Sequence, residues 1–244
     1  MTSRAPISPI LAAVRTVPIP PKSSAEDFPQ SIEPFVTISR EPGAGALGVG
    51  HSLVEAINAE AGQKKHWTFW DRELVEKVAA DHQLSTRLIE GLEEKSHSWI
   101  SSFLNSLSFT SPIGSDEDAI YGKVKRNIQA LALAGRVVIV GRGGVFVTRR
   151  MPGAIHIRLV APLKNRIQFM AQKLSVTEKA AASRIREIEK NRRAFFHMHW
   201  PNQSLNPDNF TLTINTAEVQ VDSLLLMMKT LVRQKMHLAK MAVE

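Results

Sequence analysis

The residues with the clearest chemical potential form a glycine-rich run from Gly43 to Gly50. This run follows the apolar segment from Phe35 to Ile38 and leads into a helical pattern. A strand, a glycine loop and a helix in this order direct backbone N–H groups and a helix N-terminus at a bound phosphate. The run therefore predicts a site for a phosphate-bearing ligand, although it lacks the lysine and the hydroxyl residue that usually end such a loop.

Three interpretations of this loop are open. It satisfies the dinucleotide pattern G-x-G-x-x-G, but Arg40, Glu41 and Pro42 separate the glycines from the strand. In addition, the acidic partner Asp71 lies later than the roughly 20 residues that the dinucleotide pattern expects. A degenerate phosphate loop fits the residues better, and a flexible connection without a ligand is the third interpretation.

Polar residues also follow the next two predicted strands. Asp71 and Arg72 come after the second strand, and Gly141, Arg142 and Gly143 come after the third. In an open parallel sheet, ligands bind beyond the carboxyl ends of the strands. We therefore expect these loops and the glycine run to converge on one nucleotide site, although polar strand-end loops are common in this class of protein.

A basic stripe is predicted further along the chain. Arg186, Lys190 and Arg193 recur at the i, i+4 and i+7 positions of a helical pattern, and Arg184, Arg192, His197 and His199 add to the same region. Such a charge run is commonly a solvated helix face. Alternatively, a basic hinged segment closes over phosphates, stabilises developing charge and excludes water.

Hydrophobic periodicity indicates an α/β fold with a parallel five-stranded sheet covered by helices on both faces. Strands are predicted at 35–39, 67–70, 137–140, 154–160 and 210–215. Helices are predicted at 47–61, 72–81, 85–108, 118–134, 162–174, 175–194 and 221–240, and residues 195–209 are expected to be irregular. Ser175 and Glu178 have the spacing of a capping box at the start of the helix that is predicted to end near Ala194. Residues 1–34 are rich in proline and are expected to form a disordered arm ahead of a domain at 35–240.

Composition narrows the function class. The chain has no cysteine, which excludes disulfides, thiolate metal sites and a cysteine nucleophile. Its net charge of +8 favours polyanionic ligands, but no nucleic-acid-reading motif is present, so we do not expect nucleic acid as a partner. No spacing of His, Asp and Glu indicates a metal site. We expect a cytoplasmic protein with neither a secretory signal nor a membrane span, and its oligomeric state is left open.

The combined motifs resemble the cytidylate kinase-like family, a branch of the P-loop nucleoside monophosphate kinases. The segments that carry the resemblance are 37–45, 69–73, 141–143, 192–194 and 212–216. The resemblance implies a core domain, a monophosphate-binding region and an arginine-rich helical lid at about 175–208. It also implies ATP as the phosphate donor, with Mg²⁺ carried by the nucleotide.

The resemblance further assigns roles to individual residues. The ATP phosphates would be held by the loop residues Arg40, Gly43, Ala44, Gly45, Ala46, Leu47 and Gly48. The acceptor nucleotide would be faced by Asp71, Arg72, Arg142 and Gly143. The catalytic positive charges would come from Arg142, Arg186 and Arg193, because guanidinium groups bind phosphate oxygens bidentately and stay charged.

The sequence departs from true cytidylate kinases at three positions. Ala46 stands in place of the phosphate-loop lysine, Leu47 in place of the hydroxyl residue that helps to hold Mg²⁺, and Gly143 in place of an aspartate that contacts cytosine. Phosphoryl transfer depends mainly on positioning and charge neutralisation, so arginines can compensate for a missing lysine. We expect a nucleoside monophosphate kinase-like enzyme that transfers phosphate from ATP to an acceptor such as CMP. The alternative is a non-catalytic nucleotide sensor.

Overall fold

The computed structural model describes residues 33–61, 66–80 and 116–241. The predicted arm up to residue 32 and the helices predicted over 85–108 lie outside these ranges. Within these ranges, no helix combines the length and the apolarity needed to cross a membrane.

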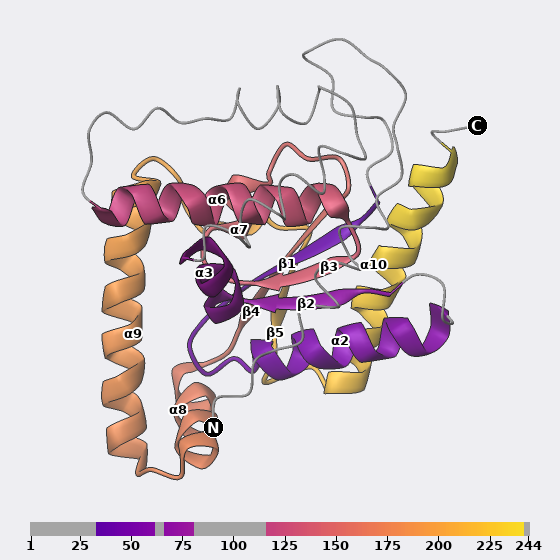
Figure 1. Ribbon diagram of the computed structural model, residues 1–244. Coiled ribbons are helices and arrows are strands. Elements are labelled where there is room, and N and C mark those ends of the chain that lie inside the picture. Colours follow the sequence, from indigo (N-terminus) through magenta and orange to yellow (C-terminus); the bar gives the residue numbers. More distant parts are fainter. Residues whose placement is uncertain (1–32, 62–65, 81–115, 242–244) are drawn as a thin grey trace, which may run out of the picture.

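A five-stranded parallel sheet lies at the centre of the described chain (Figure 1). Its strands are β1 (Phe35–Arg40), β2 (Thr68–Asp71), β3 (Val137–Val140), β4 (Ala154–Val160) and β5 (Leu212–Asn215). The strand order is β2-β3-β1-β4-β5. The prediction of an α/β fold with five parallel strands is confirmed, and the glycine loop leaves the central strand of the sheet.

Helices cover both faces of the sheet because successive residues of β1 point to opposite faces. Val36 and Ile38 pack in one core with Leu53 of α2 (Ala46–Ala61) and Met228 of α10 (Val221–Met241). Phe35 packs in the other core, which is built largely from α6 (Asp116–Ala134) and includes part of α3 (Arg72–Ala80). Figure 1 shows α6 above the sheet and α2 below it.

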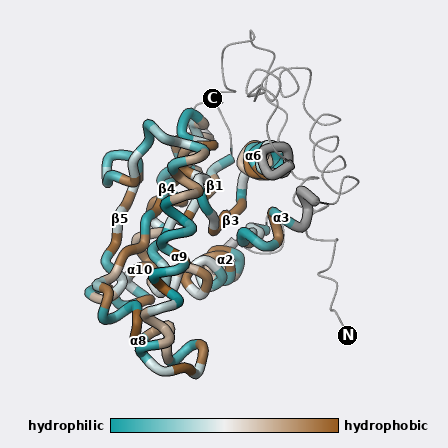
Figure 2. The backbone as a smooth tube through the Cα atoms, turned by 90° about the vertical axis from the view of Figure 1, so that its left-hand side faces the viewer, coloured by the Kyte–Doolittle hydropathy of each residue, from teal (hydrophilic) through white to brown (hydrophobic). Residues whose placement is uncertain are grey.

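A pair of helices stands beside the sheet. α8 (Leu163–Leu174) follows β4 and leads into α9 (Glu178–His199), which runs from α8 to α6 in Figure 1. Seen from that side in Figure 2, α9 carries long stretches of hydrophilic residues. A 3-10 turn, η1 (Pro207–Asn209), then leads to β5.

Three sequence-based expectations about this region are wrong. The N-cap of α9 is Thr177, whose Oγ1 accepts a hydrogen bond from the N–H of Ala180 at 3.2 Å, whereas Ser175 is the left-handed C-cap of α8. The helix also continues to His199 rather than ending near Ala194, so residues 195–199 are not irregular. Its last turn is held by aromatic packing, and it ends where Pro201 disfavours a helical conformation at Trp200.

A short helix, α7 (Gly144–Val147), follows β3 where the sequence pattern indicated only a loop. The hydroxyl of Thr148 closes it by donating to the carbonyl of Gly144 at 2.8 Å. Gly144 lies against Thr37 of β1, with only 3.3 Å between the Cβ atom of Thr37 and the position of a Cβ on Gly144. This close approach seats α7 directly on the sheet.

Candidate functional site

The glycine loop joins Arg40 at the end of β1 to Ala46 at the start of α2. Gly43 and Gly45 have φ angles of +87° and +76°, which L side chains rarely adopt. A Cβ on Gly43 would lie 2.6 Å from the main-chain oxygen of Arg166, whereas a Cβ on Gly45 would meet no described atom within 4 Å. The loop is therefore fixed by packing at Gly43, and it leaves the backbone at Gly45 open to an approaching phosphate.

The first two residues of α2 offer no charge to that phosphate. Ala46, which the resemblance aligns with the phosphate-loop lysine, is 4% exposed and belongs to the core on this face of the sheet. Leu47 is exposed but has no ligand atom for a metal. Any positive charge at the loop must therefore come from other elements.

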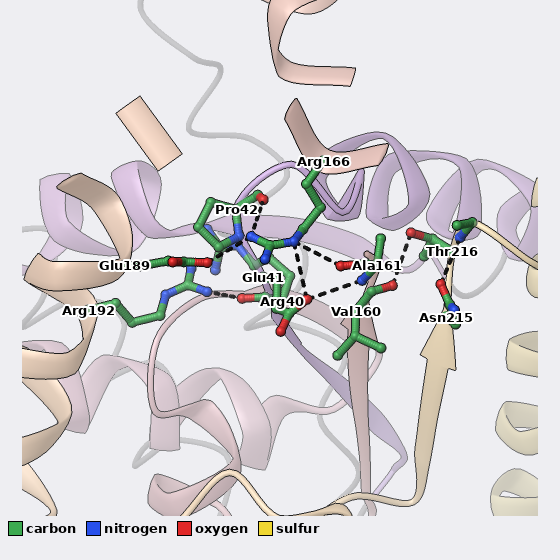
Figure 3. Close-up of polar contacts among 11 residues, drawn as sticks. Arg40, Glu41, Pro42, Val160, Ala161, Arg166, Glu189, Arg192, Asn215 and Thr216 are labelled. Carbon is green, nitrogen blue, oxygen red and sulfur yellow. Dashed lines mark hydrogen bonds and ion pairs between the residues drawn. The ribbon is translucent and has the colours of Figure 1, made fainter. Parts of the chain in front are cut away.

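The side chain of Arg166 on α8 holds the loop in place (Figure 3). Its side chain is buried, and its Nη1 donates to the carbonyl of Pro42 at 3.3 Å. Its Nε donates to the carbonyl of Ala161 at 2.9 Å and lies 3.4 Å from Oε2 of Glu41. The same Nη1 also bonds Oε1 of Glu189 on α9 at 2.8 Å. One buried guanidinium therefore ties the glycine loop to both α8 and α9.

Two further arginines carry the positive charge at the loop. Arg192 of α9 reaches the end of β1, where its Nη1 donates to the carbonyl of Arg40 (Figure 3). Burial, followed by repulsion from neighbouring arginines, lowers the pKa of Arg40 to about 10 and that of Arg192 to about 9. Both guanidinium groups therefore stay charged at neutral pH. Among the residues that the structure describes, Nη1 of Arg40 and Nε of Arg192 are buried without a hydrogen-bond partner.

These two arginines belong to a larger basic cluster at the carboxyl ends of the strands. Repulsion from Arg142 and Arg72 contributes to the lowered pKa of Arg40, and repulsion from Arg142 and Arg158 contributes to that of Arg192. Burial is the main cause in both cases. Mutual repulsion of buried cations favours an anionic ligand, because each guanidinium gains a counter-charge when the ligand binds.

A cleft adjoins this basic cluster. Its apolar wall comes from α3, α6, β3 and α9, and its polar side includes Asp71, Arg72 and Arg142. The carboxylate of Asp71 accepts the N–H of Leu74 at 2.8 Å, which fixes Asp71 at the start of α3. The lining residues are Asp71, Arg72, Val75, Glu76, Tyr121, Val124, Ile128, Ile139, Val140, Gly141, Arg142 and Phe195. The polar side holds two carboxylates and two guanidinium groups, and Arg72 is paired with Glu76 at 3.3 Å. A cleft with one apolar wall and such a polar side suits a small molecule with a compact body and polar groups.

Gly143 lies behind this cleft, under the ring of Trp200 at the end of α9. Its φ is +73°, and a Cβ added there would overlap the indole. Trp200 in turn belongs to an aromatic group with Tyr121 and Phe195, and the guanidinium of Arg142 lies 5.4 Å from the Phe195 ring centroid. The end of α9 therefore packs against the loop that carries Arg142.

The structure brings most of the sequence-predicted site residues together at one edge of the sheet. Asp71, Arg72 and Arg142 lie close enough to Arg40 to affect its pKa, and the glycine loop begins at Arg40. Arg186 and Arg193 are placed differently. Both are exposed on α9, and Arg186 donates to Ser183 of its own helix at 3.1 Å.

Arg192 and Arg166 are the residues that the sequence reasoning did not single out for the site. Arg192 is seven residues beyond Ile185 and four before Phe196, so helical periodicity places all three on one face. Ile185 is fully buried on that face. An arginine within the apolar stripe of α9 was therefore the available signal, whereas Arg166 gave none, because its partners are distant in sequence.

The amino-acid sequence is similar to those of known proteins. The sequence model of the cytidylate kinase-like family matches residues 35–218. A stretch of 87 residues is 28% identical to uronate isomerase from Corynebacterium glutamicum, and it covers 36% of this chain but only 17% of that protein. The chain therefore spans about a sixth of that relative's length.

The chain is similar to solved structures of other proteins. An uncharacterized protein from Eubacterium ventriosum superposes with a TM-score of 0.53 at 17% identity, over 82% of this chain and 98% of that one. Shikimate kinase from Bacteroides thetaiotaomicron gives a TM-score of 0.45 at 12% identity, over the same shares of the two chains. At 17% identity, the likeness to the Eubacterium ventriosum protein concerns the fold and not the substrate.

Proposed function

The chain belongs to the cytidylate kinase-like family, and we propose that it transfers a phosphoryl group from ATP to a small phosphate-bearing acceptor, with CMP as the first candidate. In this proposal the glycine loop holds the ATP phosphates, and Asp71, Arg72 and Arg142 face the acceptor, whereas Gly143, which the resemblance also assigned to the acceptor, packs under Trp200. The loop lacks the lysine, and buried arginines take its place.

The observation that carries this proposal is the partly buried pair of Arg40 and Arg192 beside the loop. Each has a nitrogen atom with no partner among the described residues, and each has a pKa lowered first by burial and then by nearby arginines. Leaving a buried donor unpaired costs about 1–3 kcal/mol, and more for a charged group. A phosphate bound beside these two guanidinium groups would supply the missing counter-charge.

The acceptor side follows from the cleft. Arg142 and Arg72 line it together with apolar residues, which suits an acceptor whose anionic group pairs with guanidinium and whose body packs on the apolar wall. In the reaction, an acceptor phosphate oxygen would form a bond to the γ-phosphorus of ATP while the bond to the bridging oxygen breaks, which leaves ADP. Mg²⁺ would arrive bound to the ATP phosphates, and the arginines would stabilise the charge of the transferring group.

The experiment is an ADP-release assay with ATP and each common nucleoside monophosphate, combined with calorimetric titration of ATP. We expect ATP to bind and one monophosphate to stimulate ADP release strongly. The same assay on Arg192→Ala tests the role of that arginine. Lys179→Ala serves as its charge-matched control, because Lys179 is exposed in the first turn of α9. Failure of the chain to bind ATP would overturn the proposal.

A second candidate is a nucleotide sensor without catalysis. It is favoured by one observation: the positions aligned with the lysine and the hydroxyl residue hold a buried alanine and an exposed leucine. ATP binding without ADP formation across the whole monophosphate panel would support the sensor over the kinase.

A further inference from the structure

We propose that Arg166 and Glu189 are positioning residues that set the place of Arg192 relative to the glycine loop. This inference rests on the proposed function, because it assumes that the loop and Arg192 bind phosphate. It assigns no contact with the ligand to either residue. Their role is to hold α9 against the loop so that the Arg192 guanidinium stays beside the backbone of Arg40.

Arg166 holds the glycine loop through both its main chain and its side chain. Arg166 fills the space beside Gly43. A Cβ added to Gly43 would lie 2.6 Å from the main-chain oxygen of Arg166 and 2.9 Å from the Cβ of Arg166. Its guanidinium bonds the carbonyl of Pro42 at 3.3 Å and the carbonyl of Ala161 at 2.9 Å. The conformation of the loop between Arg40 and Gly43 therefore depends on a side chain that is only 7% exposed.

Two residues of α9 connect this helix to the glycine loop. Glu189 and Arg192 are three residues apart in one helix, so they lie on neighbouring turns of the same face. Glu189 accepts from Arg166, and Arg192 donates to the carbonyl of Arg40 (Figure 3). α9 is thus attached to the glycine loop at two points, directly through Arg192 and indirectly through Glu189 and Arg166.

The sign of the effect distinguishes a positioning role from a simple charge effect. The carboxylate of Glu189 raises the pKa of Arg192, so it offsets part of the positive charge at the site. If only that charge mattered, removing it would tighten the binding of a polyanion. If Glu189 positions Arg192, removing it weakens binding although the site becomes more positive.

The test measures the Kd of inorganic tripolyphosphate and of ATP by calorimetry for the wild-type chain and three variants. Glu189→Ala is expected to raise both Kd values about tenfold, the change that corresponds to losing a hydrogen bond to a charged group. Glu189→Gln retains an acceptor for Arg166 and is expected to raise them only about threefold. Glu187→Ala removes an equal charge from the exposed side of α9, where Glu187 pairs with Arg184, and should change Kd less than twofold.

Hydrogen exchange provides a second readout that needs no ligand. In Glu189→Ala, the amides of Glu41 and of residues 43–46 should exchange faster than in the wild-type chain, whereas Glu187→Ala should leave them unchanged. If Glu189→Ala does not fold, Glu189→Gln decides by the same two measurements.

Two results would overturn the inference. If the wild-type chain binds neither tripolyphosphate nor ATP, the proposed function fails and this inference fails with it. If the wild-type chain binds them and Glu189→Ala binds equally well or more tightly, the inference alone is wrong and the proposed function stands.

Discussion

A one-residue shift along α9 separates a partly buried arginine from an exposed one. Arg192 reaches the carbonyl of Arg40, while Arg193 is exposed. Successive helical residues are rotated by about 100° around the axis, so neighbours with identical chemistry face different surroundings. The pattern of basic residues on α9 therefore does not distinguish Arg192 from Arg193, but their exposure does, and we propose Arg192 as the one that binds phosphate.

Replacing Arg192 tests this distinction. Arg192→Ala is expected to weaken ATP binding about tenfold or more, because it removes a desolvated guanidinium from the loop. Arg192→Lys should recover only part of the affinity, since an ammonium group lacks the planar fork of arginine. Calorimetric titration with ATP measures both variants. The assignment from the resemblance makes the opposite prediction, that Arg193→Ala and Arg186→Ala weaken binding more than Arg192→Ala does.

Gly143 and Trp200 form a matched pair that stability measurements can test. Gly143→Ala is expected to cost about 2–5 kcal/mol, the sum of the left-handed backbone and overpacking against the indole. In a Trp200→Leu background the cost should fall by about 1–3 kcal/mol, because the overlap is relieved. Urea unfolding of the single and double variants gives the coupling. Gly122→Ala in α6 is the control, since a Cβ there would meet no described atom within 4 Å. Strict additivity of the two substitutions would contradict the pairing.

At the level of elements, the boundary between α8 and α9 depends on two residues with different roles. Thr177 caps α9 with its side chain, whereas Ser175 has a φ of 54° at the end of α8. Local sequence favoured the capping box because its spacing is correct, but a residue in the left-handed conformation is already committed to ending the preceding helix. The turn therefore divides the work between the two hydroxyl residues.

Substitutions in this turn should change stability in opposite directions. Thr177→Ala is expected to lower the free energy of unfolding by about 1 kcal/mol, because the N–H of Ala180 loses its partner. Ser175→Gly is expected to raise it by up to about 1 kcal/mol, because glycine adopts positive φ without strain. Urea unfolding of the two variants measures these changes. A capping box at Ser175 would instead make Ser175→Gly destabilising.

The sequence was sufficient for the five strands, but it missed α7, the end of α9 and several contacts between elements. The strand at Ala154–Val160 is predicted with its observed bounds because its signal is local: apolar Ile155, Ile157 and Leu159 alternate with polar residues. The extension of α9 to His199 was missed because its last turn is stabilised by Tyr121 of another helix. Arg166 was missed for a similar reason, since Pro42 and Glu189 meet it only in the folded chain.

At the level of the whole molecule, the strand order places the glycine loop at the centre of the sheet. β1 lies between β3 and β4, so residues that follow three neighbouring strands share one edge. The arginines at this edge come from β1, β3, β4 and the two helices α3 and α9. The site is therefore a product of topology, and its positive charge depends on the assembly of the complete sheet.

Deeper in the sheet, a buried histidine should make the stability of the fold depend on pH. His156 is hydrogen-bonded through Nδ1 to Oγ1 of Thr37 at 2.7 Å. Burial, aided by the charges of Lys235 and Arg149, lowers the pKa of His156 to about 4. Between this value and the ordinary histidine pKa of about 6.5, the unfolded chain binds the proton more readily. The free energy of unfolding should therefore fall as the pH falls from about 7 towards 4, by about 3 kcal/mol in total.

Urea titrations between pH 4.5 and 7.5 measure this dependence. In His156→Gln the decline contributed by this histidine should disappear, while His66→Gln, at an exposed position, should retain it. An unchanged pH profile in His156→Gln would show that other groups cause the acid destabilisation.

The burial of Ala46 determines how readily a lysine could be introduced at this position. A lysine introduced at that position would start from a core site, where a cation without a partner is strongly disfavoured. It would also add a positive charge beside arginines that already repel one another. A single substitution at Ala46 is therefore not expected to create a lysine-dependent loop. Arginines of α9 and of the strand ends would have to be removed first.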